Sequence, residues 1–418
     1  MRFQVPRGTV DILPEEQKYW EYIQNTTKKI SASFGYSKID TPIFEDTGLF
    51  LRSVGESSDI LQKETYTFLD RGGDSLTLRP EGTASVARAY VEHGMHNQPQ
   101  PVRLFYLFEN FRYERPQSGR YRSFHQFGVE AFGETEFYID VEVIELCWNL
   151  MTTLGLNDLT LVLNSIGCMN CRPIYLNELI NYFKERIDKM CPDCNKRINA
   201  NPLRILDCKQ NSCEEFIESS PKSVSFLCNE CSEHYEKVTA SLSNIKIPFE
   251  TDHKLVRGLD YYSKTVFEIV PPLEGRTKVL AGGGRYDGLI EQIDGPSVPG
   301  VGFAMGIERI IDNLKRLEVN IPVENSLQIL IACMGENAKN HGIEIAAAIR
   351  QEKISAIIGP SRGIKSQMKY ASSINATHVV IIGDDEINKQ TYQVKNLNTG
   401  EQEEISQENL INFFKKLQ

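Results

Sequence analysis

The sequence predicts an α+β protein in which a helix-covered, mainly antiparallel sheet is followed by a small α/β domain. Three observations lead to this prediction. Strand-like runs with sparse helices extend to residue 304, a cysteine-rich segment interrupts them, and strands alternate with helices beyond residue 326. A chain of 418 residues is also too long for one ordinary hydrophobic core, so two or three domains are expected.

The N-terminal part is expected to hold a long helix, an edge strand and a hairpin. Apolar residues recur at helical spacing over residues 15–34, and Gly35 ends that helix. Residues 37–44 look like a strand, but Pro42 lacks a backbone donor, so this strand should lie at an edge or interface. A turn at residues 70–74 joins two strand-like runs, 65–70 and 75–79, as a hairpin. Pro80 then begins a helix that runs to Glu92.

The rest of the chain changes character twice. Further strands are expected at residues 104–111, 124–132, 265–271, 277–283 and 301–304. Residues 165–250 interrupt this pattern, hold eight of the ten cysteines and are interpreted as an inserted small domain. After a linker at residues 316–326, strands at 328–332, 356–358 and 378–382 alternate with helices at 337–350 and 363–373, which predicts a parallel sheet. The expected domains are therefore residues 1–325 and 326–418.

The composition, 41% hydrophobic and 24% charged, is typical of a soluble globular protein. No stretch approaches the roughly 20 continuous apolar residues of a membrane span, and residues 1–10 lack a signal-peptide core, so a cytoplasmic protein with no membrane partner is expected. The net charge of −10 argues against indiscriminate nucleic-acid binding. Residues 102–122 and 350–369 carry local charges of +3 and +4, which permit a nucleic-acid partner but are more often solvated faces.

Three arginines in polar, glycine- or aromatic-flanked segments are the first candidates for chemistry: Arg112, Arg257 and Arg309. Their planar, permanently charged forks suit a polyphosphate whose charge must be neutralised during attack. Any one of them alone would be interpreted as a surface ion pair. A Rossmann fold is not supported, because the glycines at 282–284 are followed by Arg285 and Tyr286 and open no helix.

Seven motifs resemble the histidyl-tRNA synthetases, a family of class II aminoacyl-tRNA synthetases. They are PRGT at 6–9, LRPEGTA at 78–84, FRYERP at 111–116, RYRSFHQ at 120–126, LVRGLDYY at 255–262, AGGGRYDG at 281–288 and GFAMGIER at 302–309. The resemblance covers essentially the whole chain. The motifs at 255–262 and 281–288 are specific to the histidine branch, and the others mark class II synthetases generally.

This resemblance implies a six-stranded antiparallel class II catalytic core, a C-terminal α/β anticodon-binding domain, and a homodimer built on the strand that contains Pro42. It also implies activation of L-histidine by ATP, with Mg²⁺ as counter-ion, through a histidyl-adenylate, and transfer of histidine to tRNA(His). The implied ATP-binding residues are Arg112, Glu114, Arg120, Phe124 and Arg309. Among them, Arg112 would hold the α-phosphate, Arg120 and Arg309 the outer phosphates, and Phe124 would stack on adenine. Glu114 would accept a hydrogen bond from the adenine amino group or its neighbours.

The histidine-binding residues come partly from the resemblance and partly from side-chain chemistry. By resemblance, Glu81, Thr83 and Gln126 would hold the ammonium group. Arg257, with Arg112 one of two expected catalytic residues, would bridge the histidine carboxylate and the α-phosphate. Neutral imidazole offers one donor and one acceptor. Glu130, on the same strand face as Gln126, would accept from the ring, with Tyr262 meeting the other nitrogen and Tyr261 shaping the pocket. For two adjacent tyrosines alone, core packing is the commoner explanation, and alternation turns His125 to the opposite face.

The insertion carries a separate metal signal. One four-cysteine zinc site is expected from two CxxC pairs separated by nineteen residues: Cys168, Cys171, Cys191 and Cys194. A second candidate is formed by Cys208, Cys213, Cys228 and Cys231. Reduced cysteines in a small packed domain remain the alternative, and any zinc would be structural. Cys147 and Cys333 are interpreted as core residues.

Two other functions fit parts of the sequence. A catalytically inactive, synthetase-like regulatory subunit of histidine biosynthesis would share the fold, but such subunits usually lose the ATP-site arginines and the C-terminal domain, and both are present here. A pure RNA-binding module would leave Glu81, Gln126, Glu130 and Tyr262 without a role.

Overall fold

The computed structural model describes residues 3–54, 63–116, 119–271, 279–322 and 327–417. The chain divides into two compact units, Met1–Ile321 and Pro322–Gln418. The boundary expected between residues 325 and 326 falls within 323–326, outside the described residues. None of the described helices is long and apolar enough to cross a membrane.

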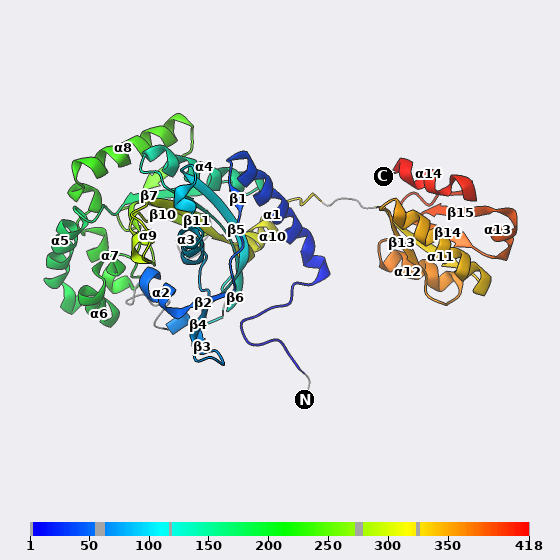
Figure 1. Cartoon of the computed structure of the whole chain (residues 1–418), viewed down its shortest axis with the longest axis horizontal. Coiled ribbons are helices and arrows are strands. Elements are labelled where there is room, and N and C mark those ends of the chain that lie inside the picture. Colours follow the sequence, from blue (N-terminus) through cyan, green and yellow to red (C-terminus); the bar gives the residue numbers. More distant parts are fainter. Residues whose placement is uncertain (1–2, 55–62, 117–118, 272–278, 323–326, 418) are drawn as a thin grey trace. The chain divides into compact units, whose positions relative to one another are not determined.

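A sheet of eight strands in the order β1-β5-β6-β11-β10-β9-β7-β8 forms the centre of the first unit (Figure 1). The six strands from β5 to β7 pair antiparallel throughout, while β1 and β8 add a short parallel strand at each edge. The expected α+β fold with an antiparallel core is confirmed. The bounds are β1 Ser37–Lys38, β5 Val102–Phe111, β6 Ser123–Phe132, β7 Thr160–Ser165, β8 Phe249–Thr251, β9 Ser263–Val270, β10 Ala281–Arg285 and β11 Gly300–Gly306.

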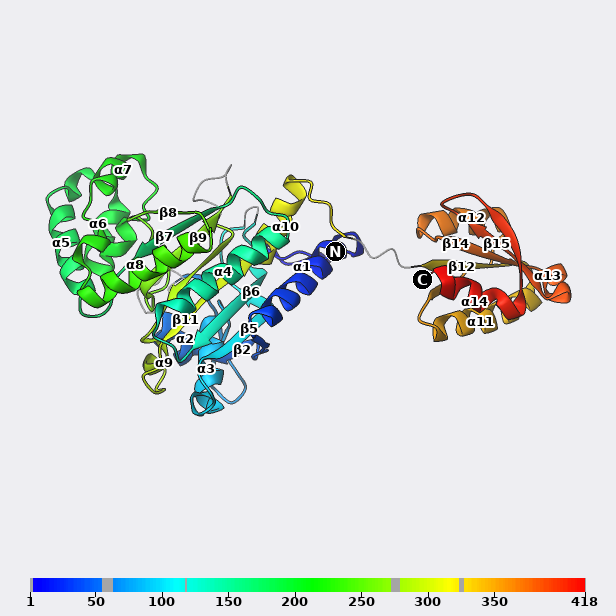
Figure 2. The ribbon, with the colours of Figure 1, turned by 90° about the horizontal axis from the view of Figure 1, so that it is seen from above.

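Helices cover both faces of this sheet. On one face, helices α1, α4 and α10 run across the strands (Figure 2) and bury a single apolar cluster that includes Phe127, Ile144 and Phe303. The other face carries α3, α9 and an aromatic cluster around Tyr106 and Tyr286. The helix bounds are α1 Pro14–Ser33, α3 Thr83–Glu92, α4 Phe137–Thr153, α9 Leu289–Gln292 and α10 Ile307–Arg316, with a short 3-10 helix at Met95–Asn97.

The strand expected over residues 37–44 is wrong in one respect, because it is split between two sheets. Its first two residues form β1, and its last residue opens β2 in a small three-stranded sheet. Pro42 lies in the connection, where the Arg79 guanidinium donates to the carbonyls of Thr41 (2.7 Å) and Pro42 (3.0 Å). The expected hairpin is present as β3 and β4. The bounds are β2 Phe44–Asp46, α2 Thr47–Val54, β3 Tyr66–Leu69 and β4 Ser75–Leu78.

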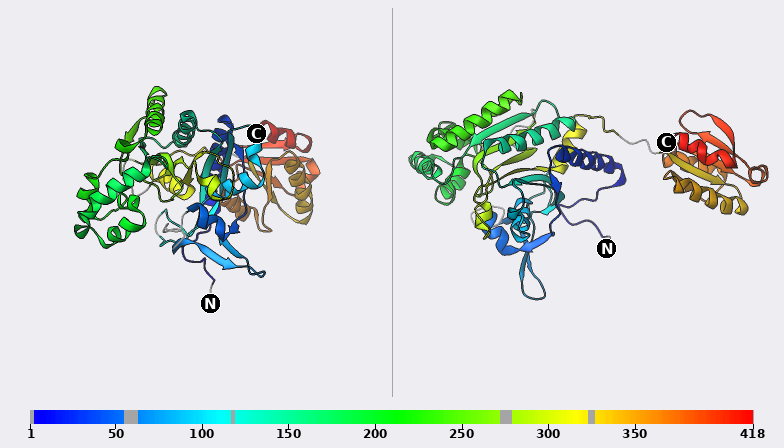
Figure 3. Two further views of the ribbon diagram at one scale, coloured as in Figure 1. Left: turned by 60° about the vertical axis from the view of Figure 1, so that its left-hand side comes forward. Right: turned by 45° about the horizontal axis from the view of Figure 1, so that its top comes forward.

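The cysteine-rich insertion is almost entirely helical and lies beside the β7–β8 edge of the sheet (Figures 2 and 3). It leaves the sheet after β7 and returns through β8 to β9. Its helices are α5 Arg172–Lys184, α6 Pro192–Ala200, α7 Asn211–Glu218 and α8 Asn229–Asn244, with 3-10 helices at Ile187–Lys189, Pro202–Ile205 and Ser223–Phe226.

The second unit is a five-stranded sheet in the order β13-β12-β14-β15-β16. β12 pairs parallel with β13 and β14, as expected, but β15 and β16 form an antiparallel hairpin that extends the sheet. The all-parallel expectation is therefore incomplete. The bounds are β12 Gln328–Cys333, α11 Glu336–Gln351, β13 Ser355–Ile358, α12 Ile364–Ser373, β14 His378–Ile382, α13 Asp384–Lys389, β15 Thr391–Asn396, β16 Gln402–Ser406 and α14 Gln407–Leu417.

Candidate active site

A polar cavity of about 800 Å³ lies in the first unit. Its volume falls within the range of roughly 300–1,000 Å³ usual for small-molecule sites. Strands β6, β10 and β11 contribute to its lining, as do the insertion and the arginine-rich segment that precedes β6. Eleven of the twelve residues expected to bind ATP or histidine line this cavity, all except Glu130: Glu81, Thr83, Arg112, Glu114, Arg120, Phe124, Gln126, Arg257, Tyr261, Tyr262 and Arg309.

Three arginines converge near one carboxylate in this cavity. Arg112 and Arg120 lie 3.9 and 3.4 Å from the carboxylate oxygens of Glu114. Arg309 donates to the carbonyls of Gly119 (3.1 Å) and Val279 (2.8 Å), which fixes its direction. Burial lowers the pKa of Arg309, and repulsion by Arg120 adds to that effect. An anion placed among these guanidinium groups would relieve their repulsion.

The Arg112 guanidinium group is also oriented by a backbone carbonyl and an aromatic ring. Its Nε donates to the carbonyl of Pro80 at 2.8 Å, and its guanidinium lies 5.3 Å from the centre of the Phe124 ring. A planar adenine beside Phe124 would therefore lie close to a fixed positive charge.

Arg257 is positioned by a carboxylate and by a glycine strand. Its Nη1 lies 2.5 Å from Oε1 of Glu268, and its guanidinium lies 5.5 Å from the Tyr262 ring centre. A Cβ at Gly282 would lie 2.3 Å from Nη1, so only glycine leaves room for the guanidinium beside β10. The Arg257 Nε is buried without a hydrogen-bond partner among the described residues, which leaves a donor for a ligand.

Glu130 is buried and lies beside the cavity instead of lining it. Its Oε1 accepts from the hydroxyls of Thr83 (2.8 Å) and Tyr106 (3.3 Å), and its Oε2 accepts from Tyr286. A Cβ at Gly302, which does line the cavity, would lie 2.2 Å from Oε2. Burial raises the pKa of Glu130 from 4.5 to about 8. Thr83 and Tyr286 therefore link the buried carboxylate to the cavity.

Two acceptors expected to hold an ammonium group are held by neighbouring donors. The Glu81 carboxylate accepts from the backbone N–H groups of Thr83 and Ala84, each at 2.8 Å, at the first turn of α3, which begins at Thr83 and not at Pro80. Burial raises the pKa of Glu81. The amide oxygen of Gln126 accepts from Asn110 at 2.7 Å. Each oxygen retains a further lone pair for a ligand.

His125 lies away from the cavity, as alternation predicts. Its ring packs edge-on against Trp20 of α1 at 4.7 Å, and its Nδ1 lies 3.0 Å from Glu308. The same Glu308 oxygen accepts the His125 backbone N–H at 2.8 Å. His125 therefore joins β6 to the helices behind the sheet.

Sequence analysis missed three residues of the site: Glu268, Tyr106 and Tyr286. Tyr286 belongs to the AGGGRYDG motif, so a signal for it existed. Glu268 and Tyr106 lie in ordinary-looking strands, and nothing in their local sequence indicates a buried partner across the sheet.

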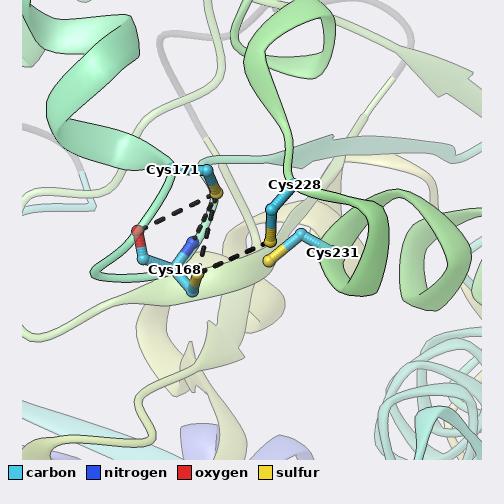
Figure 4. Close-up of side chains that lie close together, drawn as sticks. All are labelled: Cys168, Cys171, Cys228 and Cys231. Carbon is cyan, nitrogen blue, oxygen red and sulfur yellow. Dashed lines mark hydrogen bonds between the residues drawn. The ribbon is translucent and has the colours of Figure 1, made fainter.

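The eight cysteines of the insertion form two groups of four, but the expected grouping is wrong. Cys168 and Cys171 lie with Cys228 and Cys231 (Figure 4), here called the outer group, which lies at the root of the insertion. The inner group consists of Cys191, Cys194, Cys208 and Cys213. The insertion folds back before α8, and this return brings its last CxxC pair to its first. All ten cysteines are free thiols, and Cys147 and Cys333 are buried as expected.

An antiparallel sheet with a polar cavity and converging arginines, joined to a separate α/β unit, has the features of a class II aminoacyl-tRNA synthetase. A family model described as histidyl-tRNA synthetase matches residues 8–171 and 206–310, and one described as an anticodon binding domain matches residues 328–417. The chain belongs to the histidyl-tRNA synthetase family. The gap between the matched segments contains Cys191 and Cys194.

Full-length relatives agree with this assignment. The chain is 50% identical to a histidine–tRNA ligase of Natranaerobius thermophilus over 97% of each chain. It is 48% identical to a histidine–tRNA ligase of Dehalococcoides mccartyi over 99% of each chain. The structure of the apo histidyl-tRNA synthetase of S. aureus matches with a TM-score of 0.84 at 39% identity, covering 99% of this chain and 100% of that one.

Proposed function

We propose that this chain is an enzyme that joins L-histidine to tRNA(His), forming histidyl-adenylate from ATP and releasing diphosphate before the transfer releases AMP. The observation that carries the proposal is the gathering of eleven expected ligand-binding residues in one cavity. Cations converge near Glu114, while hydroxyls and buried carboxylates surround Tyr286. Such a cavity suits an anionic nucleotide and a small amphoteric amino acid.

In the first step a carboxylate oxygen of histidine attacks the α-phosphorus, forming an O–P bond while the bond to the diphosphate breaks. A carboxylate is already anionic at neutral pH, so no residue must remove a proton. Arg257 would bridge the attacking carboxylate and the α-phosphate, and Arg112 would hold that phosphate. Arg120 and Arg309 would neutralise the leaving diphosphate. Positioning and charge stabilisation would then supply most of the reduction in the activation barrier.

Recognition of the imidazole is assigned to the hydroxyl network around Glu130. The ring N–H would donate toward the Glu130 carboxylate, close to the hydroxyls of Thr83 and Tyr286, and Tyr262 would meet the other nitrogen. A site built to hydrogen-bond its substrate rejects analogues that lack the polar groups by roughly 10⁴-fold or more.

Magnesium would enter with the nucleotide, because Mg²⁺ is usually held by one or two carboxylates together with substrate phosphates. Among the described residues, the groups of three or more metal-ligating side chains are the two cysteine groups, whose sulfurs do not suit Mg²⁺. Glu114 is the carboxylate best placed to share the ion, since it lies among the phosphate-directed arginines. The ion would supply charge neutralisation at the phosphates.

The second unit is proposed to bind the anticodon end of the tRNA. All five basic residues of the stretch 350–369 are exposed: Arg350, Lys353, Arg362, Lys365 and Lys369. By contrast, the arginines at 102–122 are largely engaged inside the first unit; Arg103, for example, forms a two-pronged ion pair with Glu142. The exposed set supports phosphate contacts whose affinity falls with salt.

A homodimer is proposed at the β1 edge of the large sheet. The neighbouring small sheet exposes the large hydrophobic residues Phe44, Phe68 and Leu69, and Ile43 just before β2 is exposed as well. Phe44 and Phe68 already contact each other edge-on at 6.3 Å, so the exposed residues form a patch that a second copy would cover.

A cytoplasmic location and a structural zinc also belong to this proposal. Ten free thiols, eight of them in two tight groups, are the usual state of cysteines in a reducing compartment. Thiolate groups of this kind bind zinc.

The deciding experiment is histidine-dependent exchange of labelled pyrophosphate into ATP, followed by charging of tRNA(His), with the full chain. The proposed enzyme gives both. A regulatory subunit of histidine biosynthesis would bind histidine without exchange, and an RNA-binding module would do neither. Exchange that is absent, or equally fast with another amino acid, would overturn the proposal.

A further inference from the structure

The sulfur atoms of the insertion have the spacing of two tetrahedral metal sites. All ligand atoms in each group lie within 4.8 Å of one another. The Sγ atoms of Cys168 and Cys228 are 3.9 Å apart, and those of Cys191 and Cys208 are 3.7 Å apart. Four sulfurs around zinc at about 2.3 Å form a tetrahedron with edges of about 3.8 Å. A disulfide would need about 2.05 Å.

The outer group joins the insertion to the sheet. Cys168 and Cys171 precede α5, and Cys228 and Cys231 begin α8 (Figure 4). The backbone N–H of Cys168 donates to Sγ of Cys171 at 3.2 Å, as amides do to metal-bound thiolates. The adjacent Gly167 accepts from the backbone of Lys264 in β9 at 2.9 Å. A metal here would tie both ends of the insertion to the strands that carry the cavity.

The inner group lies at the cavity itself. Cys191 and Cys194 open α6, while Cys208 and Cys213 flank the start of α7. Cys191 donates its backbone N–H to Sγ of Cys213 at 3.2 Å. Cys208 is both a member of this group and a lining residue of the cavity, together with its neighbours at 206, 207 and 209–211.

Charged residues of this segment also influence the pKa of Glu268, the partner of Arg257. The pKa of Glu268 is raised mainly by burial and lowered by Arg257. Asp207 raises it further and Lys209 lowers it, and all four of these residues line the same cavity. Residues 207–210 belong to no helix or strand; besides the cysteine group, Cys208 donates its backbone N–H to Ile205 at 3.0 Å, and Asp207 lies 3.8 Å from Arg204.

We propose that each group binds one zinc ion, and that the inner zinc holds residues 206–211 in place as a wall of the substrate cavity. The two metal sites stand independently of the proposed function, whereas the role of the wall rests on it. Because each group joins segments of the insertion that are distant in sequence, metal binding would contribute directly to its folding.

The zinc content of the full chain tests the grouping. Double variants distinguish the outer and inner groups from the sequential grouping, in which the first four cysteines of the insertion bind one ion and the last four bind the other. The purified chain should hold two zinc ions per molecule. Cys168→Ser/Cys228→Ser and Cys191→Ser/Cys208→Ser should each retain one, whereas Cys168→Ser/Cys191→Ser should retain none. Sequential grouping predicts the reverse for all three variants, with none, none and one zinc ion retained, and that result would overturn the assignment. Cys333→Ala, in the other unit, is the control and should retain two.

A measurement on the unchanged chain covers the case in which a variant fails to fold. Stepwise modification of its thiols with a mercurial should release two zinc ions in total, with eight thiols accounting for the release. A chain that contains no zinc, and takes up none when zinc is added, overturns the metal proposal whatever the variants do.

The wall is tested by substrate binding. Loss of the inner zinc should raise the KM for histidine or ATP by about tenfold to a hundredfold, the usual cost of displacing a site by about an ångström. Loss of the outer zinc should have a smaller effect on KM. Equal increases in KM after loss of either zinc ion would overturn the proposed role of residues 206–211 as a cavity wall. A chain that holds two zinc ions but lacks exchange activity would overturn the proposed function while leaving the metal sites intact.

Discussion

Replacing Glu130 with glutamine separates the charge of this buried group from its shape. The carboxylate accepts from Thr83, Tyr106 and Tyr286, and an amide of nearly the same size can stay within hydroxyls that rotate to suit it. Glutamine removes the titration while leaving the packing almost unchanged. The variant therefore isolates what ionisation of Glu130 does to stability and to histidine binding.

The size of the stability effect follows from the raised pKa. Burial raises the pKa of Glu130 from 4.5 to about 8, so the folded chain binds this proton more tightly than the unfolded chain. The folded state therefore loses stability as pH rises from about 4.5 to about 8, and the loss is complete above that range. At pH 7 the loss amounts to about 3 kcal/mol. The Glu130→Gln chain avoids it, so its advantage over the unchanged chain should grow from pH 5 to pH 8.

Tryptophan fluorescence provides a suitable assay, because both tryptophans, Trp20 and Trp148, lie in the first unit. Thermal unfolding should be followed from pH 5 to pH 9 for the unchanged chain, Glu130→Gln and the control Glu250→Gln, which alters an exposed residue. If the curves for all three chains fall in parallel with pH, the reasoning about Glu130 is refuted.

Ligand affinity gives a second result from the same variant. We expect histidine binding to weaken about tenfold while ATP binding stays nearly unchanged, because an amide lacks the charge that strengthens a hydrogen bond from the ring N–H. The difference in histidine affinity should widen between pH 6 and pH 9 as Glu130 ionises in the unchanged chain. Equal losses for both ligands would assign Glu130 to the fold and not to the imidazole pocket.

Arg257→Ala should lower adenylate formation by about 10²–10³-fold, as expected for one preorganised donor, while histidine binding stays measurable. The single variant leaves Glu268 as an unpaired buried charge, so the double variant Arg257→Ala/Glu268→Gln should regain stability but not exchange activity. Near-normal exchange in either variant would exclude Arg257 from the mechanism. A chain ending at residue 325 should still exchange pyrophosphate, provided that it folds and dimerises, but charge tRNA poorly through weaker tRNA affinity; undiminished charging would contradict the proposed role of the second unit. Ile43→Asp should shift sedimentation toward the monomer, whereas Phe3→Asp, at a fully exposed residue, should not; an unchanged dimer would move the interface elsewhere.

Most strands and a few of the helices could be predicted from local sequence. The helix expected over residues 15–34 is α1, and the strands expected at 104–111 and 124–132 are β5 and β6 with nearly the same bounds. Side-chain periodicity follows from local backbone geometry, so a window of about ten residues contains it. Pro42 is an informative exception. Its missing donor predicted a strand at an edge, and both β1 and β2 lie at the edges of their sheets. The split between two sheets was not predictable, since the connection contacts the distant Arg79.

The candidate site was predictable where a motif carries its residues together. Arg112, Glu114, Phe124 and Gln126 come from two neighbouring segments joined by one hairpin, and their meeting in the cavity follows from β5 pairing with β6. The partner that fixes Arg257 was not predictable. Glu268 lies on β9 and reaches Arg257 only because Gly282 on the adjacent β10 leaves space.

The sequence by itself indicated many of the helices and strands and the residue types that the cavity needs. Only the tertiary structure decided which of those residues meet, and the cysteines show why. Each CxxC spacing predicts that two sulfurs share a site, because both lie within one local turn. Which pair completes the site depends on where the chain returns after α5, α6 and α7, and that path is set by the packing of the whole insertion on β7 and β9. Local periodicity contains no information about this return.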